Sequence, residues 1–359
     1  MVEATANSIE DYLIDGLSFK LQPGASYVTD RRSVSYFTAG SNIYQSGSGA
    51  RVIRINLTGD GWLDPSTIRM LFTLRNNDAG KALRTIGGPW SFFRRVRCLC
   101  GGAIIDDIDF YNRVHEQMHI LSSKLNRDND DIEGFGYRWD SDANYGQTID
   151  TGHFPGIAAG SFHTVSFKPL LGLFAQSKYI PLMWCPITLE FEIVSTATDA
   201  IVTAFAGAAF TSDNTSQAWQ IEDARVICDV VTLDTALQNS YAEHVLSGKA
   251  LPINYNTYIS ILQACAGPNI NVNVTRAVSR LKTVFFSFDK ANTPSATAGT
   301  LIQKDWNNFE HPMNGEYDAT KKVQYQIQIG SKLFPEYPVR SLAQAFFELK
   351  KALGIASSS

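Results

Sequence analysis

The chain has 359 residues, of which 44% are hydrophobic and 18% charged, with a formal net charge of -4 at pH 7. This balance is that of a globular protein of one large or two ordinary domains, and it excludes a disordered polar chain. The slight negative charge and the lack of an Arg/Lys-rich arm exclude strong direct binding of nucleic acid. With no signal peptide and no apolar run of the ~18 residues that span a membrane, we expect a soluble protein made in the cytosol.

Residues 1–15 form a predicted N-terminal arm. Ile9, Tyr12 and Leu13 lie on one side of a short helical pattern, which docks on the domain or anchors it to a neighbour or a membrane surface. From Leu17 the sequence indicates mainly strands. Apolar residues alternate with polar ones from Ile53 to Leu57 and again from Ile68 to Leu74, the period of half-buried strands.

A strand–turn–strand–helix plan occurs twice. Residues 91–100 predict a strand, followed by a Gly101-Gly102 turn, a second short run and an amphipathic helix that reaches Leu125. Residues 323–353 repeat this order with a turn at Gly330. The helical stripe of the first copy is Tyr111, Val114, Met118, Leu121 and Leu125. The order of predicted elements is therefore duplicated, although the amino-acid sequence is not.

Strands resume after a long polar loop over residues 126–160. Further strands are predicted at 162–167, 187–193 and 219–233, the last with a bulge near Asp223-Ala224. A helical linker covers 234–250, and strand patterns then restart near Tyr255, Val272 and Val284. We expect an all-β fold with a few short helices, divided into a first jelly roll at 16–233 and a second at 251–359.

The sequence His115-Glu116-Gln117-Met118-His119 is an HExxH motif on the first predicted helix. In zinc peptidases the two imidazoles bind the metal and the glutamate activates water. Here the apolar stripe turns Glu116 nearly opposite the core and the histidines toward solvent or a subunit contact. Glu133 or His153 could be proposed as a third ligand. A zinc metallopeptidase is the alternative function, and a structural helix is the preferred interpretation.

Other candidate residues are weaker. Arg94, Arg95 and Arg97 precede Asp106, Asp107 and Asp109, which favours local pairing or an intersubunit contact over polyanion binding. Asp128, Asp130 and Asp131 lack the spacing of a calcium loop. The five cysteines, without a CxxC pair, indicate buried free thiols. No nucleophile–base pair or phosphate loop is visible, so we expect no catalytic residues, no metal and no cofactor.

Several stretches, taken in order, resemble the double jelly-roll major capsid proteins of tailless double-stranded DNA viruses of the adintovirus, polinton-like and virophage type. They are FKPLLGLF at 167–174, KYIPL at 178–182, the strand at 187–194, SRLKTVFF at 279–286 and QIGSK at 328–332. The resemblance implies two upright jelly rolls and a homotrimer of hexagonal outline that tiles an icosahedral shell. It further implies contacts with neighbouring capsomers, minor capsid proteins or an internal membrane, a place in the virion, and synthesis in the host cytoplasm.

The two halves differ in one respect. Residues 16–125 and 251–359 are nearly equal in length and both reach the helix, but only the first half continues into further strands. We therefore expect the second roll to be incomplete here, so that a longer natural polypeptide or a second chain supplies its last strands. A third possible function is a sugar-binding β-sandwich, which the aromatic residues Trp139, Tyr145 and Trp306 would allow.

Overall fold

The computed structural model describes residues 28–47, 50–83, 85–123, 126, 129–135, 157–201, 216–264, 269–287 and 324–354. The N-terminal arm, His153, Trp139, Tyr145, Trp306 and Cys265 lie outside these residues. The described chain is mainly β-structure with short helices, which confirms the predicted fold class. Among the described residues no helix is long and apolar enough to cross a membrane.

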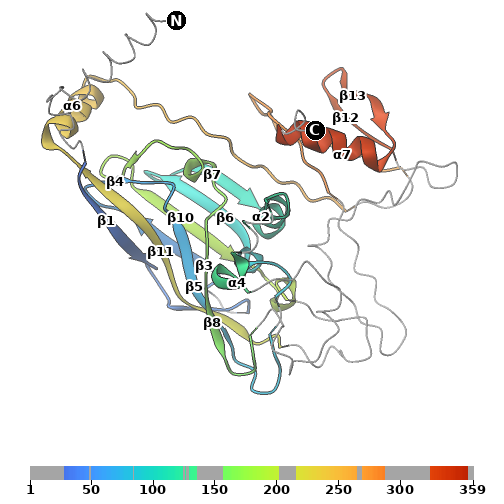
Figure 1. Ribbon diagram of the computed structural model, residues 1–359, viewed down its shortest axis with the longest axis horizontal. Helices are drawn as coiled ribbons and strands as arrows, with labels where there is room; N and C mark the ends of the chain where they lie inside the picture. Colours follow the sequence, from blue (N-terminus) through green and yellow to red (C-terminus); the bar gives the residue numbers. More distant parts are fainter. Residues whose placement is uncertain are drawn as a thin grey trace, which may run out of the picture.

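The described residues between 28 and 233 form two packed antiparallel sheets (Figure 1). The eight main strands are β1 (Val28–Phe37), β3 (Val52–Leu57), β5 (Arg69–Asn76), β6 (Phe93–Cys100), β7 (Ala103–Asp109), β8 (Phe162–Phe167), β10 (Ile187–Ile193) and β11 (Trp219–Leu233). The short strands β2 (Ile43–Tyr44), β4 (Trp62–Leu63) and β9 (Ile180–Pro181) extend the first sheet.

The pairing of the main strands is that of a jelly roll. The first strand pairs with the eighth, the second with the seventh, the third with the sixth and the fourth with the fifth, as β1–β11, β3–β10, β5–β8 and β6–β7. The pairs β5–β11 and β6–β10 then join them into two sheets, β1-β11-β5-β8 and β3-β10-β6-β7. A long hairpin rolled into two facing sheets produces this order.

The core lies between these sheets, because their strands alternate buried and exposed side chains. Every second residue of β3 and β5 is buried. Phe93 of β6 packs between the sheets with its ring centroid 5.5 Å from that of Phe72 and 5.4 Å from that of Phe191. Such aromatic pairs add about 0.5–1.5 kcal/mol each beyond the burial of their area. The aromatic cluster therefore ties the two sheets together.

Strand β11 carries the predicted bulge. Its register against β5 shifts between Glu222 and Arg225, and Asp223 has a φ of 49°. The bulge adds residues to the 15-residue β11 relative to β5 and locally increases the twist of the strand.

Helices and 3-10 turns occupy the connections of the roll and follow its last strand. They are η1 (Pro89–Phe92), α2 (Tyr111–Ile120), α4 (Asp130–Glu133), η3 (Gly172–Phe174), η4 (Ala197–Asp199) and α6 (Thr235–Leu246). Asp234 caps α6 by accepting from the N–H of Ala236 at 3.1 Å, and Gly248 follows its end with a φ of 79°.

A second hairpin–helix unit follows near the C-terminus. Strands β12 (Tyr325–Ile329) and β13 (Lys332–Val339) turn at Gly330, whose φ is 62°, and lead into α7 (Leu342–Leu353). The predicted repeat of the β6–β7–α2 plan is confirmed, and in Figure 1 this unit, in red, stands apart from the jelly roll. The strands predicted near Tyr255, Val272 and Val284 are not formed, since no described strand pairs with these residues.

Candidate functional site

The HExxH helix packs with its polar face inward. The buried side chains of α2 are Tyr111, Asn112 and Glu116. The indole N–H of buried Trp90, in η1, donates to Glu116 Oε2, and the N–H of Gly88 donates to the same oxygen at 3.4 Å. The prediction that Glu116 points away from the core is therefore wrong. An interior indole N–H needs an acceptor, and this need sets the rotation of the helix.

The histidines of the motif lie against Trp90. The His115 ring stacks on the indole with centroids 4.0 Å apart and planes 20° apart, and the His119 ring lies 4.6 Å from the indole at 55°. His115 Nε2 lies 3.2 Å from the carbonyl oxygen of Lys168. Burial lowers the pKa of His115 to about 3, so the ring is neutral and Nε2–H donates to that carbonyl. The prediction that both histidines face solvent or a subunit contact is wrong for His115.

These contacts leave the motif poorly suited to zinc chemistry. A zinc ligand must offer a nitrogen lone pair to the metal, but His115 Nε2 faces a carbonyl oxygen and the indole covers the ring. Glu133 is exposed on α4. Across the described part of the chain, no group of three His, Cys, Asp or Glu side chains is placed to hold a metal ion.

On the outer face of the sheet β3-β10-β6-β7, basic side chains of one strand lie beside acidic side chains of the next. Glu190 of β10 lies between Arg54 of β3 and Arg97 of β6, with oxygens 2.5 Å and 2.7 Å from their guanidinium nitrogens. Its side chain is only 5% exposed. Farther along, Arg95 pairs with Asp107 of β7 at 2.6 Å. The arginines expected to pair locally therefore pair within the sheet, and this face offers little uncompensated positive charge to a polyanion.

Asp106 of β7 points into the interior instead of pairing with an arginine. Its side chain is 3% exposed, and Oδ2 accepts from the N–H of Gly172 at 2.9 Å. Burial raises the pKa of Asp106 to about 6, because the charged form loses its hydration. This buried carboxyl holds η3 against β7.

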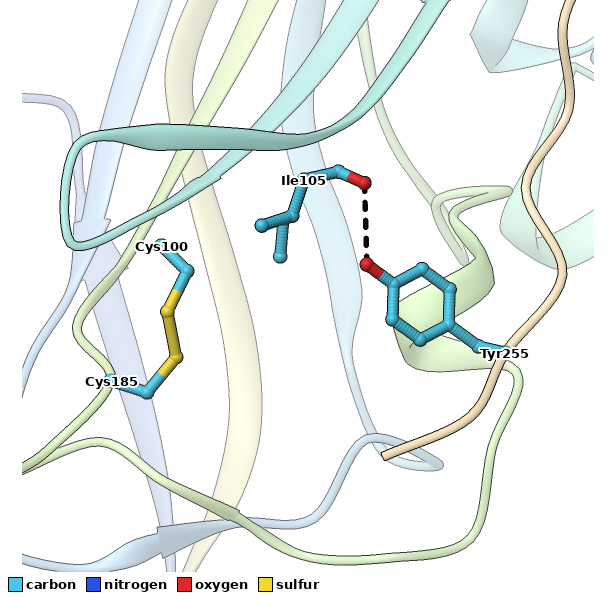
Figure 2. The surroundings of a disulfide bond; sticks show 4 residues. All are labelled: Cys100, Ile105, Cys185 and Tyr255. Atoms are coloured by element: carbon cyan, nitrogen blue, oxygen red, sulfur yellow. Dashed lines mark hydrogen bonds between the residues drawn. A yellow bond between two sulfur atoms is a disulfide. The ribbon is translucent and has the colours of Figure 1, made fainter. Parts of the chain in front are cut away.

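The segment after α6 crosses the outer edge of β7. The Tyr255 hydroxyl donates to the carbonyl oxygen of Ile105 at 3.2 Å, which Figure 2 shows, and the Ser260 hydroxyl donates to that of Asp109. A Cβ at Gly172 would lie 2.0 Å from the carbonyl oxygen of Asn256, so only glycine permits this close crossing. Side chains thus protect an edge that would otherwise present unpaired carbonyls.

A disulfide joins Cys100, at the end of β6, to Cys185, before β10 (Figure 2). The prediction that all cysteines are free thiols is wrong for this pair. The β6–β10 ladder places Cys100 opposite Ile187, which brings the Cys185 Cα to 5.7 Å, within disulfide range. Cys98 and Cys228 are buried free thiols, and burial raises the pKa of each to about 12.

No protein-family model matches this sequence, and no curated protein matches it. Solved structures do align. A chain of "PBCV-1 virus capsid, quasi-atomic model" is 16% identical with a TM-score of 0.45, over 90% of this chain and 74% of that one. PBCV-1 VP54 fitted into a reconstruction of the virophage Sputnik is 14% identical with a TM-score of 0.35, over 60% and 46%. The Faustovirus major capsid protein is 9% identical with a TM-score of 0.32, over 60% and 56%.

The chain resembles viral capsid proteins. The matched structures are viral capsid structures, and the sequence motifs also resemble those of viral capsid proteins. The chain spans about half the length of the VP54 and Faustovirus chains, at 46% and 56%. The jelly-roll assignment rests on the strand pairing described above.

Proposed function

We propose that this chain is a major capsid protein that forms trimers of hexagonal outline, which tile an icosahedral shell. The observation that carries the proposal is the rolled pairing of β1–β11, β3–β10, β5–β8 and β6–β7, followed in the same chain by a second hairpin–helix unit. That order of elements is what the sequence resemblance implies for two jelly rolls in one subunit.

The chemistry of the described surface supports a structural role. The arginines on the second sheet are neutralised within it, and the HExxH side chains hold α2 against η1. The disulfide between Cys100 and Cys185 suits a particle exposed to oxidising surroundings. The zinc-peptidase alternative gains no support from these contacts. The sugar-binding alternative rests on residues outside the described ranges and stays a prediction.

Light scattering of the purified protein tests the proposal. A trimer has about three times the 39.6 kDa mass of one chain and does not grow further as the concentration rises, because closed symmetry satisfies every subunit contact. A mass of one chain at all concentrations would contradict the proposal. Zinc bound at about one ion per chain, together with peptide cleavage, would favour the alternative.

A further inference from the structure

Residues 251–264 form a strap, an irregular segment that follows α6 and crosses the edge of β7 (Figure 1). The hydroxyls of Tyr255 and Ser260 hold the strap to backbone carbonyl oxygens of β7. Near the start of the strap, Lys178 Nζ donates to the carbonyl oxygen of Pro252 at 2.8 Å. A segment held by a few side-chain hydrogen bonds can open while the sheets beneath it stay folded.

The strap covers Asp106, the buried carboxyl of β7. Gly172, whose N–H donates to Asp106 Oδ2 at 2.9 Å, lies directly against the strap, because a Cβ there would be 2.0 Å from the carbonyl oxygen of Asn256. Burial and the nearby charge of Asp106 raise the pKa of Tyr255 and of Tyr258, so both strap tyrosines lie close to the carboxyl. The carboxyl is therefore enclosed by β7, η3 and the strap.

Asp106 has no ion pair with any described residue. Its Oδ1 is buried and makes no hydrogen bond of normal geometry. The N–H groups of Gly172 and Asp107 favour its charged form, but burial outweighs them. The titratable side chains near this carboxyl are all either uncharged at neutral pH or acidic, namely Cys98, Asp107, Tyr111, Tyr255 and Tyr258. A carboxylate buried without a cation is unstable relative to the same group in water.

Opening of the strap returns this carboxyl to water. While Asp106 is protonated, the closed form buries no charge. Once Asp106 is ionised, the closed form must keep a carboxylate out of water, so ionisation shifts the equilibrium toward the open form. The pKa of Asp106 is about 6 in the closed form, against an ordinary value of 3.8. The closed form is therefore favoured most below pH 3.8 and loses that advantage as the pH rises to about 6.

We propose that residues 251–264 act as a pH-sensitive strap, which stays closed over Asp106 while this carboxyl is protonated and opens when it ionises. Opening breaks the hydrogen bonds of Tyr255 and Ser260 to β7 and releases the chain that leads from α6 toward the C-terminal unit. The sheets of the jelly roll keep their pairing. This proposal does not rest on the capsid role.

Native-state proteolysis of the full-length chain measures the opening, because cleavage follows the population of the open form when reclosing is fast. Chymotrypsin at pH 7.5 should cut the wild type after Tyr255 or Tyr258, and mass spectrometry of the fragments gives the rate. Asp106→Asn should slow this cleavage about tenfold or more, because the amide cannot ionise. At pH 4, pepsin should cut the strap of the wild type and of this variant at equal rates.

Two further variants separate charge from packing. Asp107→Asn removes a carboxyl of the same strand that pairs with Arg95, so chymotrypsin should cut this control nearly as fast as the wild type. Tyr255→Phe removes the hydrogen bond to Ile105 but keeps an aromatic ring that chymotrypsin accepts. The Tyr255→Phe strap should be cut faster at both pH values, and adding Asp106→Asn should still slow its cleavage at pH 7.5.

Three results would overturn the proposal. Equal cleavage of the wild type and Asp106→Asn at pH 7.5 would mean that the strap does not respond to the charge, and faster cleavage of the variant would mean that the charge holds the strap closed. A tenfold difference between the two at pH 4 would show that the amide acts through packing. Cleavage within β6 or β11 as fast as in the strap would show that the whole roll unfolds.

Discussion

Breaking the bond between Cys100 and Cys185 should destabilise the jelly roll through its unfolded state. The two residues are 85 apart in sequence, so the bond removes about 4–5 kcal/mol of chain entropy from the unfolded ensemble. The folded geometry should persist, because the Gly101 N–H donates to the Pro186 carbonyl oxygen at 3.1 Å beside the bond. We expect Cys100→Ser with Cys185→Ser to lower the melting temperature by roughly 8–20 °C, at ~2–4 °C per kcal/mol.

Denaturant unfolding under non-reducing conditions measures this loss. In the presence of a thiol reductant, the wild type should have the same free energy of unfolding as the double variant. The reductant should not change the free energy of unfolding of the double variant. The other described thiols, Cys98 and Cys228, are buried and protonated, so they should not contribute. A thiol assay of the unfolded chain should find two fewer thiols before reduction than after it. Equal thiol counts, or unchanged unfolding free energy in reductant, would refute the reasoning.

The buried acids yield two further predictions. The pKa of Asp106 is about 6 in the folded chain, against an ordinary value of 3.8. The free energy of unfolding should therefore fall by about 3 kcal/mol as the pH rises from below 3.8 to above 6, because the buried carboxyl must lose its proton in the folded state. Asp106→Asn should remove that loss, raising the free energy of unfolding at pH 7.5 but not at pH 3.5. A fall in the free energy of unfolding at pH 7.5 that is absent at pH 3.5 would show instead that the charge has a stabilising partner. Glu116→Ala should cost about 1–3 kcal/mol in a thermal melt by leaving the Trp90 N–H unpaired, whereas Glu116→Gln keeps an acceptor. Equal stability of the two would contradict this role.

Local pattern predicted much of the jelly roll. The alternation from Trp219 to Leu233, interrupted at Asp223-Ala224, indicated a long bulged strand, and β11 has those bounds and that register shift. Glycines at 101, 102 and 330 marked both hairpin turns, and all three have positive φ. Such features depend on neighbouring residues, which a single sequence contains. The division of the whole chain into two jelly rolls stays a prediction.

Features that depend on distant partners could not be predicted in this way. The face that α2 buries is set by the indole N–H of Trp90, 26 residues from Glu116 in the sequence. The apolar pattern of the helix contains no information about this hydrogen-bond donor. The disulfide depends on the β6–β10 ladder, which the spacing of Cys100 and Cys185 does not reveal. Alternation around Val272 and Val274 predicted a strand, but a strand forms only when another strand pairs with it, and no described strand pairs there.

Negative-stain imaging of the purified protein tests the central claim most directly. The account predicts particles of uniform size with a hexagonal outline and threefold symmetry, each a trimer built from jelly-roll subunits. The Glu116→Gln variant should give the same particles, because the HExxH motif serves packing within one subunit. Compact single subunits, or particles of another symmetry, would contradict the account.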